Sequence, residues 1–417
     1  ERGKYPNVVE KINYLNELGI NAIELMPVKE SPGDYSWGYC PVHYFAADSS
    51  YGTTAQLKEM IDELHGAGIR VIVDGVYNHA NTDSPLAQMD HDYWFRHEPR
   101  DKKYNWGPEF HYDYFDEKLG FSPARKFVHD SLKFWILKYQ IDGVRYDAAI
   151  QIADFDVMHE FVEITREMSP MKPFLNIAEY LPPDPQLVAP QGPMDSCWND
   201  NFMHIVTDYL TSEIFNLEEL KNAIDCRRFG FQDAASVVNY IANHDHNRLF
   251  LMLGEKGFFG DEAHCRARLG ALLLLTAVGI PMIWMGEEFG EYKEKTTESN
   301  KINWSLLENP LNKTLFEHYK TLINLRKTNP AFQTANLEFF HEDADSGVLC
   351  FQRFDDRGNV AAVAVNFSNQ NLENYAIKNF PEGENWHEWT KNYETQTNDN
   401  SMTVSLPRRE GLIFIKQ

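Results

Sequence analysis

Opposite charges occur two positions apart in the apolar stretch IDGVRYDAA, residues 141–149. Side chains at positions i and i+2 of a strand point to the same face, so Arg145 and Asp147 must share one space. A strand that only filled a core would not place an arginine and an aspartate together. This pair therefore marks a candidate site at the C-terminal end of a strand.

Polar side chains stand at the ends of other apolar stretches as well. The stretches are VDGVYNH (73–79), DGVRYD (142–147), LNIAEY (175–180) and IANHDHN (241–247), and their polar residues are Asp74, Asn78, His79, Arg145, Asp147, Glu179, Asn243, His244 and Asp245. Singly, each has a structural explanation, such as a helix cap, a turn or an ion pair. Carboxylates at the ends of three apolar strands are not explained in that way.

Cleavage of a glycosidic bond needs such a set, because its transition state resembles an oxocarbenium ion. One carboxylate must stay ionised as the nucleophile, and we expect Arg145 to lower the pKa of Asp147. A second carboxyl must hold a proton, which a drier setting for Glu179 would allow. A third carboxylate, Asp245, can bind sugar hydroxyls, and histidines can donate hydrogen bonds to the developing charge.

The elements that must position these residues alternate along the first 330 or so residues. Hydrophobic periodicity predicts helices over 8–18, 55–68, 124–140, 156–168, 217–225, 262–279 and 311–327, and strands over 21–28, 69–79, 141–147, 173–180, 195–200, 236–245 and 280–289. Apolar strands separated by helices predict an α/β fold with a parallel sheet covered on both faces. We expect a TIM-type (β/α)8 barrel, and an open doubly wound sheet is less favoured because no Gly-rich phosphate loop follows a strand. Seven strands are predicted where the barrel needs eight, so we expect the first strand upstream of Glu1 or replaced.

Two further segments depart from this alternation. Residues 80–121 are dense in rings and charges, which predicts an inserted domain over the barrel mouth and a lid containing Tyr93, Trp94, Trp106 and Tyr112. After Thr334, short strands are separated by Gly, Asp and Asn turns, which predicts an antiparallel β-sandwich. The expected division is a barrel over 1–79 and 122–330, the inserted domain over 80–121, and a C-terminal domain over 331–417.

Composition narrows the class of partner. Asp and Glu number 62 against 39 Lys and Arg, a net charge of −23, which argues against nucleic-acid binding and suits a neutral substrate. The apolar run 271–285 is shorter than the ~20 residues of a membrane span and contains Gly279 and Pro281, so we expect no membrane partner. Five scattered cysteines without a CxxC pair predict reduced thiols and a cytoplasmic location. The state of assembly stays open between a monomer and an unknown oligomer, because no pattern in the sequence bears on it.

The ordered segments DGVYNH, GVRYD, IAEY and ANHD resemble the four signature regions of the α-amylase superfamily, glycoside hydrolase family thirteen. GINAIELMPV (19–28) and GIPMIWMGEEFG (279–290) are similar to flanking motifs of that family, so the resemblance spans nearly the whole chain. It implies an α-glucan substrate, namely starch, glycogen or maltooligosaccharide, and a retaining mechanism. Asp147 and Glu179 are then expected to lie ~5 Å apart.

The resemblance also assigns roles to individual residues. Asp147 falls on the nucleophile, Glu179 on the general acid/base, and Asp245 on the carboxylate that holds the sugar at the cleavage point. Arg145, His79 and His244 match supporting residues, and Asp74 and Asn78 match positions that brace the site. Tyr39, in SWGYCPVHYF, matches a tyrosine that stacks under the reacting sugar. Trp94 and Trp106 of the lid are expected to contact substrate.

Departures from the family pattern keep several activities open. Many α-amylases carry Lys–His where Ile150 and Gln151 stand, in a stretch that also helps to hold calcium, so we expect no cofactor and no metal site. The segments 23–39 and NDNFMH (199–204) look more like glucan branching enzymes and maltooligosyl trehalose trehalohydrolases. The alternatives are thus hydrolysis of α-1,4 bonds, transfer that makes α-1,6 branches, and trehalohydrolase activity. Two other classes also stay open: a catalytically silent glucan-binding protein, and a metal-dependent barrel hydrolase using His244 and His246.

Overall fold

The computed structural model describes residues 3–33 and 36–417, which form two compact units. The first unit comprises Glu1–Trp198 and Thr296–Lys301, and the second comprises Asn199–Lys295 and Ile302–Gln417. Residues 34–35 fall within the segment 23–39 that was compared with branching enzymes, and they lie outside the described residues.

The first unit is built on a parallel sheet. Its strands follow the order β1 (Ala22–Leu25), β4 (Arg70–Gly75), β5 (Gly143–Tyr146), β6 (Leu175–Ala178) and β7 (Ser196–Asn199). The register pairs Asp74 with Arg145, Arg145 with Ile177, and Ile177 with Ser196. Because paired residues of neighbouring strands share a face, these four side chains form one layer across the sheet.

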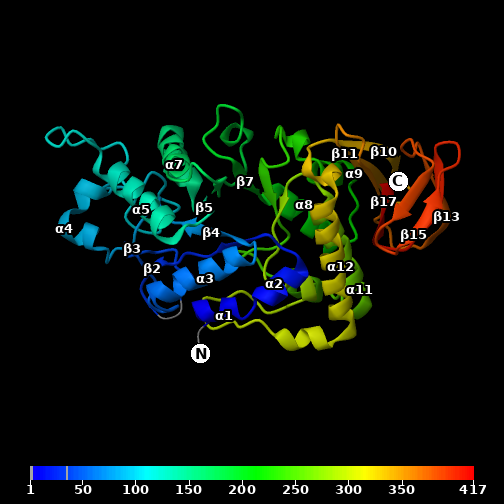
Figure 1. The fold of residues 1–417 in the computed structure, drawn as a ribbon, viewed down its shortest axis with the longest axis horizontal. Coiled ribbons are helices and arrows are strands. Elements are labelled where there is room, and N and C mark those ends of the chain that lie inside the picture. Colours follow the sequence, from blue (N-terminus) through cyan, green and yellow to red (C-terminus); the bar gives the residue numbers. More distant parts are fainter. Residues whose placement is uncertain (1–2, 34–35) are drawn as a thin grey trace. The chain divides into compact units, whose positions relative to one another are not determined.

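Helices connect the strands of the first unit. They are α1 (Tyr5–Val9), α2 (Ile12–Leu18), α3 (Thr54–Gly66), α4 (Pro85–Trp94), α5 (Pro123–Tyr139), α6 (Ala149–Ile152) and α7 (Phe155–Met168), and a short hairpin pairs β2 (Lys29–Glu30) with β3 (His43–Ala47). Thr53 and Gln56 cap α3 reciprocally, each side chain accepting from the other's backbone N–H. In Figure 1, α5 and α7 lie beside β5 and pack against each other.

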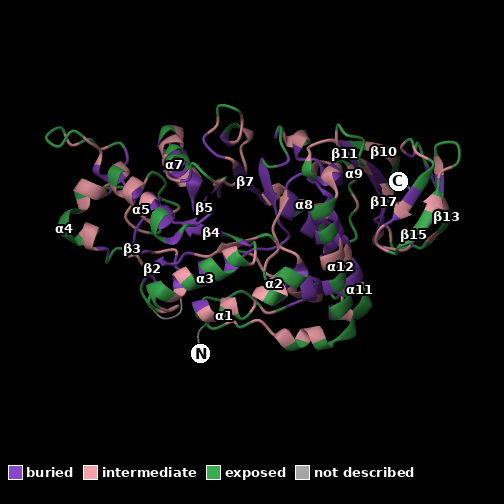
Figure 2. Cartoon of the chain, in the orientation of Figure 1, coloured by how far each residue is buried: buried purple, intermediate pink, exposed green. Residues whose placement is uncertain are grey.

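The second unit contains the remaining helices and strands of the α/β part. These are α8 (Asp200–Leu210), α9 (Leu217–Ile224), β8 (Val237–Asn239), α10 (Leu249–Glu255), α11 (Gly260–Thr276), β9 (Ile280–Pro281) and α12 (Pro310–Thr328), with β8 and β9 parallel. Figure 2 shows β4, β5 and β7 of the first unit in purple, while α12 of the second carries green, exposed bands. Among the described residues, no helix is both long and apolar enough to cross a membrane.

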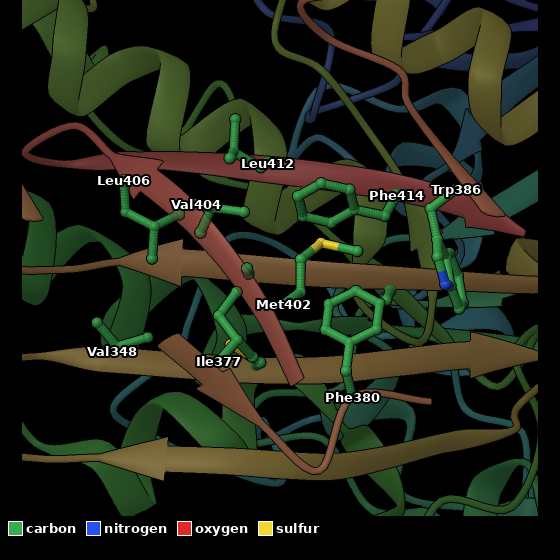
Figure 3. Close-up of a cluster of buried hydrophobic side chains, with 12 residues drawn as sticks. Val348, Ile377, Phe380, Trp386, Met402, Val404, Leu406, Leu412 and Phe414 are labelled. Carbon is green, nitrogen blue, oxygen red and sulfur yellow. The ribbon is translucent and has the colours of Figure 1, made fainter. Parts of the chain in front are cut away.

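An antiparallel β region completes the second unit. One sheet has the order β10 (Leu337–Asp343), β11 (Val348–Phe354), β12 (Val360–Asn366), β17 (Glu410–Lys416), β14 (Asn385–Glu388) and β15 (Tyr393–Gln396), and a second pairs β13 (Leu372–Lys378) with β16 (Ser401–Leu406). Figure 3 shows the core between them, where Trp386, Phe380 and Phe414 lie close to Met402 and Ile377. Alternating inward side chains of two sheets form the core, as in a sandwich.

The structure differs from the predicted elements in several places. The helix predicted over 8–18 is two helices, because the chain turns between Val9 and Ile12. The strands predicted over 69–79 and 280–289 end earlier, at Gly75 and Pro281, and the rest of each segment is loop or short turn. Helix α4 arises inside the predicted insertion. In the described residues no strand precedes Ala22, and the domain boundaries stay a prediction.

Candidate active site

Arg145 is the centre of the site in the first unit. Its side chain is fully buried, at 0% exposure, and three carboxylates surround it. Nη1 donates to Asp74 Oδ2 at 3.0 Å and to Asp147 Oδ1 at 2.9 Å, while Nη2 lies 2.9 Å from Glu179 Oε2. Burial alone would lower the pKa of Arg145, but the surrounding carboxylates raise it overall. The strand-end residues of β4, β5 and β6 therefore converge as predicted, around one guanidinium.

The pKa of Asp147 differs from the prediction. We expected Arg145 to hold it low, yet it is raised well above the usual range, first because the carboxyl is buried. Arg145 lowers it, but Glu179 and Asp74 oppose that effect, and Asp147 is hydrogen bonded through its side chain to Glu179. Two carboxyls can hydrogen bond only if one carries a proton. Burial and the neighbouring carboxyls thus favour the protonated form of Asp147.

A left-handed residue directs the chain after Asp147. Ala148 has φ +49° and ψ +39°, a conformation that costs a non-glycine residue on the order of 1 kcal/mol. The turn lets the Ala148 N–H donate to Glu179 Oε2 at 2.8 Å. The next backbone N–H, of Ala149, donates to the Glu179 carbonyl at 2.9 Å. Backbone strain on β5 thus positions the carboxyl carried by β6.

The bracing residues lie on the side of Asp74. Tyr39 donates its hydroxyl to Asp74 Oδ2 at 2.5 Å, and burial raises the pKa of Asp74 to about 6. His79 is 2% exposed and burial lowers its pKa to about 4, so its ring is neutral near pH 7. Its Nε2–H donates to the Tyr39 carbonyl at 2.9 Å, which leaves Nδ1 facing the Asn78 amide at 3.5 Å. His79, which Asn78 contacts, therefore helps to hold Tyr39 in place, and a contact of His79 with sugar stays a prediction.

The two lid tryptophans have different surroundings. Trp106 is 45% exposed, and its ring lies 5.8 Å from the His79 ring, beside the site. Trp94 ends α4 and packs edge-on against Phe127 of α5, with ring centroids 5.7 Å apart. The contacts of Trp106 suit a sugar platform, while those of Trp94 belong to the aromatic packing between α4 and α5. A substrate role for either stays a prediction.

The third predicted carboxylate lies in the second unit. The Asp245 side chain is 45% exposed, and its Oδ2 is 3.3 Å from Nε2 of His244, which is nearly buried. The Asp245 N–H donates to Asn243 Oδ1 at 2.9 Å, and His246 Nδ1 lies 2.8 Å from the same oxygen. Asn243 thus shapes the turn that presents an exposed carboxylate. The catalytic part of Asp245 and His244 stays a prediction.

Three charged or aromatic residues that interact with Arg145 or Asp74 were not singled out from sequence. Glu24 on β1 has a pKa raised to about 8, first by burial and then by Asp74 and Glu179. Lys29 on β2 is 2% exposed, lies over the rings of Tyr77 and Trp135, and has its pKa lowered to about 7 by burial. Trp198 on β7 stacks on Arg145, with Cζ 4.1 Å from the ring centroid. The sequence offered one signal for these residues, which is that Glu24 is a charged residue inside the apolar stretch NAIELMPV.

The donor set does not fit a metal centre in the described part of the chain. No group of three or more His, Cys, Asp or Glu side chains there is arranged to hold a metal ion. His246 is directed to Asn243 and to the ring of His204, 6.2 Å away. These contacts give no support to the metal-dependent hydrolase that His244 and His246 suggested.

Two family models match the chain. The α-amylase catalytic domain matches residues 1–120 and 122–310, and the α-amylase C-terminal all-β domain matches residues 340–417. The chain belongs to the α-amylase family, as its signature segments predicted. It has the parallel-sheet fold of the TIM-barrel type with a C-terminal antiparallel domain: an α-amylase from Anoxybacillus superposes with a TM-score of 0.83 at 20% identity, over 99% of this chain and 90% of that one.

Characterised relatives have several activities. The chain is 29% identical to the malto-oligosyltrehalose trehalohydrolase of Saccharolobus solfataricus over 69% of its length, 30% identical to the pullulanase of Bacillus subtilis over 77%, and 30% identical to the 1,4-alpha-glucan branching enzyme of Aquifex aeolicus over 90%. It spans 54%, 50% and 64% of the lengths of these three relatives. Family membership therefore defines an α-glucan-active class, and the relatives differ in the bond they act on.

Proposed function

We propose that this chain is a retaining enzyme that cleaves α-1,4-glucosidic bonds in α-glucans such as starch, glycogen and maltooligosaccharides. Asp147 attacks the anomeric carbon and forms a glucosyl ester, while Glu179 gives its proton to the departing glycosidic oxygen. Water or a sugar hydroxyl then attacks the same carbon, Glu179 takes its proton, and Asp147 leaves. The configuration at the anomeric carbon is inverted twice and so retained.

The observation that carries this proposal is the single guanidinium shared by the two central carboxyls. Arg145 contacts Asp147 and Glu179 at 2.9 Å each, so it favours an anion on either one. The mechanism needs the proton on Glu179 when the leaving group departs, with Asp147 ionised. Fixed donors at the point of charge development also need no reorganisation during the reaction. A catalytically silent glucan-binding protein would have no need of this arrangement.

Substitution of the two carboxyls separates their roles. On amylose we expect Asp147→Asn and Glu179→Gln each to lose activity by about 10³-fold or more. A maltosyl fluoride needs little protonation of its leaving group, so Glu179→Gln should form the glucosyl ester from it readily, whereas Asp147→Asn should not. The matched control is Asp142→Asn at the opposite end of β5, where Asp142 accepts from the Val71 N–H at 2.8 Å. That variant should lose stability and keep its turnover, and equal loss in all three variants would contradict the assignment.

We propose that Asp245 is the carboxylate that holds the sugar being cleaved. It is exposed and charged beside His244, and the family signature ANHD includes it. Asp245→Asn should raise KM and lower kcat on maltooligosaccharides, by about 10²-fold in kcat/KM. The neighbouring His246→Gln, which keeps a polar group next to Asn243, serves as the control. Unchanged kinetics in Asp245→Asn would remove Asp245 from the site.

Hydrolysis and transfer share the glucosyl ester and differ in the group that attacks it. A branching activity is the second candidate, because the branching-enzyme relative is similar over 90% of this chain, against 69% for the trehalohydrolase. Linkage analysis of products from amylose separates them: new α-1,6 branches indicate transfer, and short linear sugars indicate hydrolysis. Release of trehalose from maltooligosyl trehalose would instead support the trehalohydrolase activity.

The remaining parts of the proposal concern metal and compartment. We propose that the enzyme acts without a metal ion, calcium included, and that it works in the cytoplasm as a monomer. All five cysteines are free thiols, which suits a reducing compartment. Activity that survives dialysis against a chelator supports the first point, and loss that calcium restores would contradict it. The molar mass in solution, measured by light scattering, tests whether the enzyme is a monomer.

A further inference from the structure

Trp198 occupies the same layer of the sheet as the two central carboxyls. The register pairs Arg145 with Ile177 and Ile177 with Ser196. Two residues further along each strand, on the same face, stand Asp147 on the first, Glu179 on the second and Trp198 on the third. The strand β7 thus places an indole where β5 and β6 place a carboxyl.

The indole covers the guanidinium of Arg145. Arg145 Cζ lies 4.1 Å from the centroid of the Trp198 ring, and the ring of Tyr39 is 5.7 Å away. Both partners of the close stack are excluded from water, at 0% exposure for Arg145 and 1% for Trp198. Cation–π attraction is strongest for tryptophan and for desolvated pairs. The stack holds the guanidinium by its face and leaves the N–H groups in its plane for hydrogen bonds.

Those N–H groups are the ones that reach the reacting carboxyls. Nη1 serves Asp74 and Asp147, and Nη2 faces Glu179. Neither Nε nor Nη2 of Arg145 has a hydrogen-bond partner, although Nη2 lies 2.9 Å from Glu179 Oε2, so the hydrogen bonds from Nη1 alone do not fix the orientation of the guanidinium plane. A flat ring against the face supplies the missing restraint, because it opposes rotation of the plane away from the carboxyls.

We propose that Trp198 is a positioning residue, which holds the plane of the Arg145 guanidinium so that one cation serves both the nucleophile and the acid/base. This inference rests on the proposed function. It names the residue that fixes the orientation of the Arg145 guanidinium relative to the two carboxyls. The indole acts through Arg145 and does not itself touch substrate. It also keeps water from the guanidinium, so that the charge acts at full strength on the carboxyls.

The titratable groups that face Arg145 define what loss of the ring would do to pH dependence. They are Glu24 of β1, Tyr39, Asp74 of β4, Asp147 directly after β5 and Glu179 directly after β6, and Lys29 of β2 acts on Asp74. Burial is the largest cause of the raised pKa of Asp147. Water admitted by a smaller side chain therefore lowers that pKa, and the limb of the pH–activity profile that reports the ionisation of Asp147 should move toward acid.

A double-mutant cycle with Arg145 tests the inference. On an activated maltosyl substrate, Trp198→Leu should lower kcat/KM about 30-fold, the equivalent of about 2 kcal/mol, and Trp198→Phe, which keeps a ring, about fivefold. In the Arg145→Gln background the effect of either substitution should fall below about threefold, because there is no cation left to position. In Trp198→Leu the limb of the pH profile that reports Asp147 should shift toward acid, on the order of half a unit.

The matched control is Trp386→Leu, since Trp386 is an equally buried indole, at 0% exposure, in the core of the C-terminal β region. It should lower stability with turnover and pH profile unchanged. Additive effects of the Trp198 and Arg145 substitutions, or a Trp198→Phe variant with wild-type kinetics, would overturn the inference. A wild-type protein without activity on any α-glucan would instead overturn the proposed function, so the two failures are distinguishable. If Trp198→Leu does not fold, the double-mutant cycle of Trp198→Phe with Arg145→Gln tests the inference on its own.

Discussion

Arg145 of the first unit and Arg353, one of the fully buried arginines of the second unit, show how the same side chain can serve chemistry or architecture. Arg145 in the first unit is surrounded by three carboxylates, and its pKa is raised. Arg353 on β11 of the second unit has 0% exposure as well, but it donates to backbone carbonyls, including Thr276 at 2.6 Å and Asn336 at 3.2 Å. Burial lowers its pKa to about 9, so it stays charged near pH 7.

The difference lies in what the partners can do. A carbonyl dipole accepts a hydrogen bond and has no proton to exchange, so the surroundings of Arg353 have one state. A carboxyl can gain or lose a proton, so the surroundings of Arg145 have several states of similar free energy. The first arrangement fixes a structure, and the second stores and moves a proton. Burial alone therefore does not identify a functional arginine, and what separates Arg145 from Arg353 is the kind of partner each one has.

The largest expected effect is on the chemistry around Arg145. Arg145→Lys keeps the charge and loses the flat fork that serves two carboxyls at once, so kcat should fall by about 10²–10³-fold. The midpoint of thermal unfolding should change little, because the carboxyls can take up protons once the guanidinium is gone. Activity on amylose and calorimetry measure the two effects. A large loss of stability with kcat preserved in the folded fraction would make Arg145 structural, like Arg353.

The second expected effect is a loss of stability without a loss of turnover, and it concerns Arg353. Arg353→Met should destabilise the protein by about 3 kcal/mol, because buried carbonyl oxygens of Thr276, Asn336 and Thr334 lose a charged donor. Turnover per folded molecule should stay at the wild-type value. Urea unfolding followed by fluorescence gives the free energy, and the assay is run at a temperature where the variant is folded. A loss of kcat larger than the loss of folded protein would show that Arg353 also contributes to the chemistry, and would contradict the difference drawn between it and Arg145.

A buried carboxyl whose raised pKa is caused mainly by burial sharpens the comparison through pH. Glu287 is 3% exposed, accepts from the Tyr319 hydroxyl at 2.8 Å, and has its pKa raised to about 8, first by burial. The folded state then binds more protons than the unfolded state between about pH 4.5 and 8, so stability falls as pH rises through this window. Glu287→Gln stays neutral and should flatten the dependence by a few kcal/mol. Parallel curves of unfolding free energy against pH for both proteins would refute the neutral state.

The smallest expected effect comes from the strained residue beside the nucleophile. Ala148→Gly removes the cost of φ +49° and should stabilise the protein by up to about 1 kcal/mol. The added freedom of the chain should weaken the hold of the Ala148 N–H on Glu179, so kcat should fall a fewfold. Ala153→Gly, with φ +51°, is the matched control away from these carboxyls. The Ala148 variant would disprove this role if it gained stability without any change in kcat.

Hydrophobic periodicity predicted most of the helices and strands, because the repeat of apolar residues records which face meets the core. It also predicted the convergence of Asp74, Asp147 and Glu179, since parallel strands end at one edge. The hairpin β2–β3 was missed: its strands are short, and Lys29, which is buried there, reads as exposed in sequence. No local pattern distinguishes a lysine that lies against two rings from one in water.

The electrostatics of the site were less predictable than its members. Arg145 beside Asp147 indicated a lowered pKa, because the pair was visible and the rest of the surroundings was not. Burial and the second carboxyl, which reverse the direction, depend on the packing of three strands. The left-handed turn at Ala148 was equally hidden, since alanine has no preference for it. Arguments from pairs of charges in the sequence can therefore predict which residues form the site and that they lie close together. They do not predict which of these residues carries a proton.

Arg353 has a consequence for modular exchange within the second unit. It ties the first turn of chain after α12 and the C-terminal end of α11 to strand β11 through carbonyls at Phe332, Thr334 and Thr276. Deleting the β region would leave the end of α11, an almost wholly buried helix, without its ionic anchor. Grafting a β region from a relative succeeds only if an arginine is supplied at this register. We therefore expect removal of the C-terminal β region to destabilise α11, and expect an exchanged region to be tolerated where it carries this arginine.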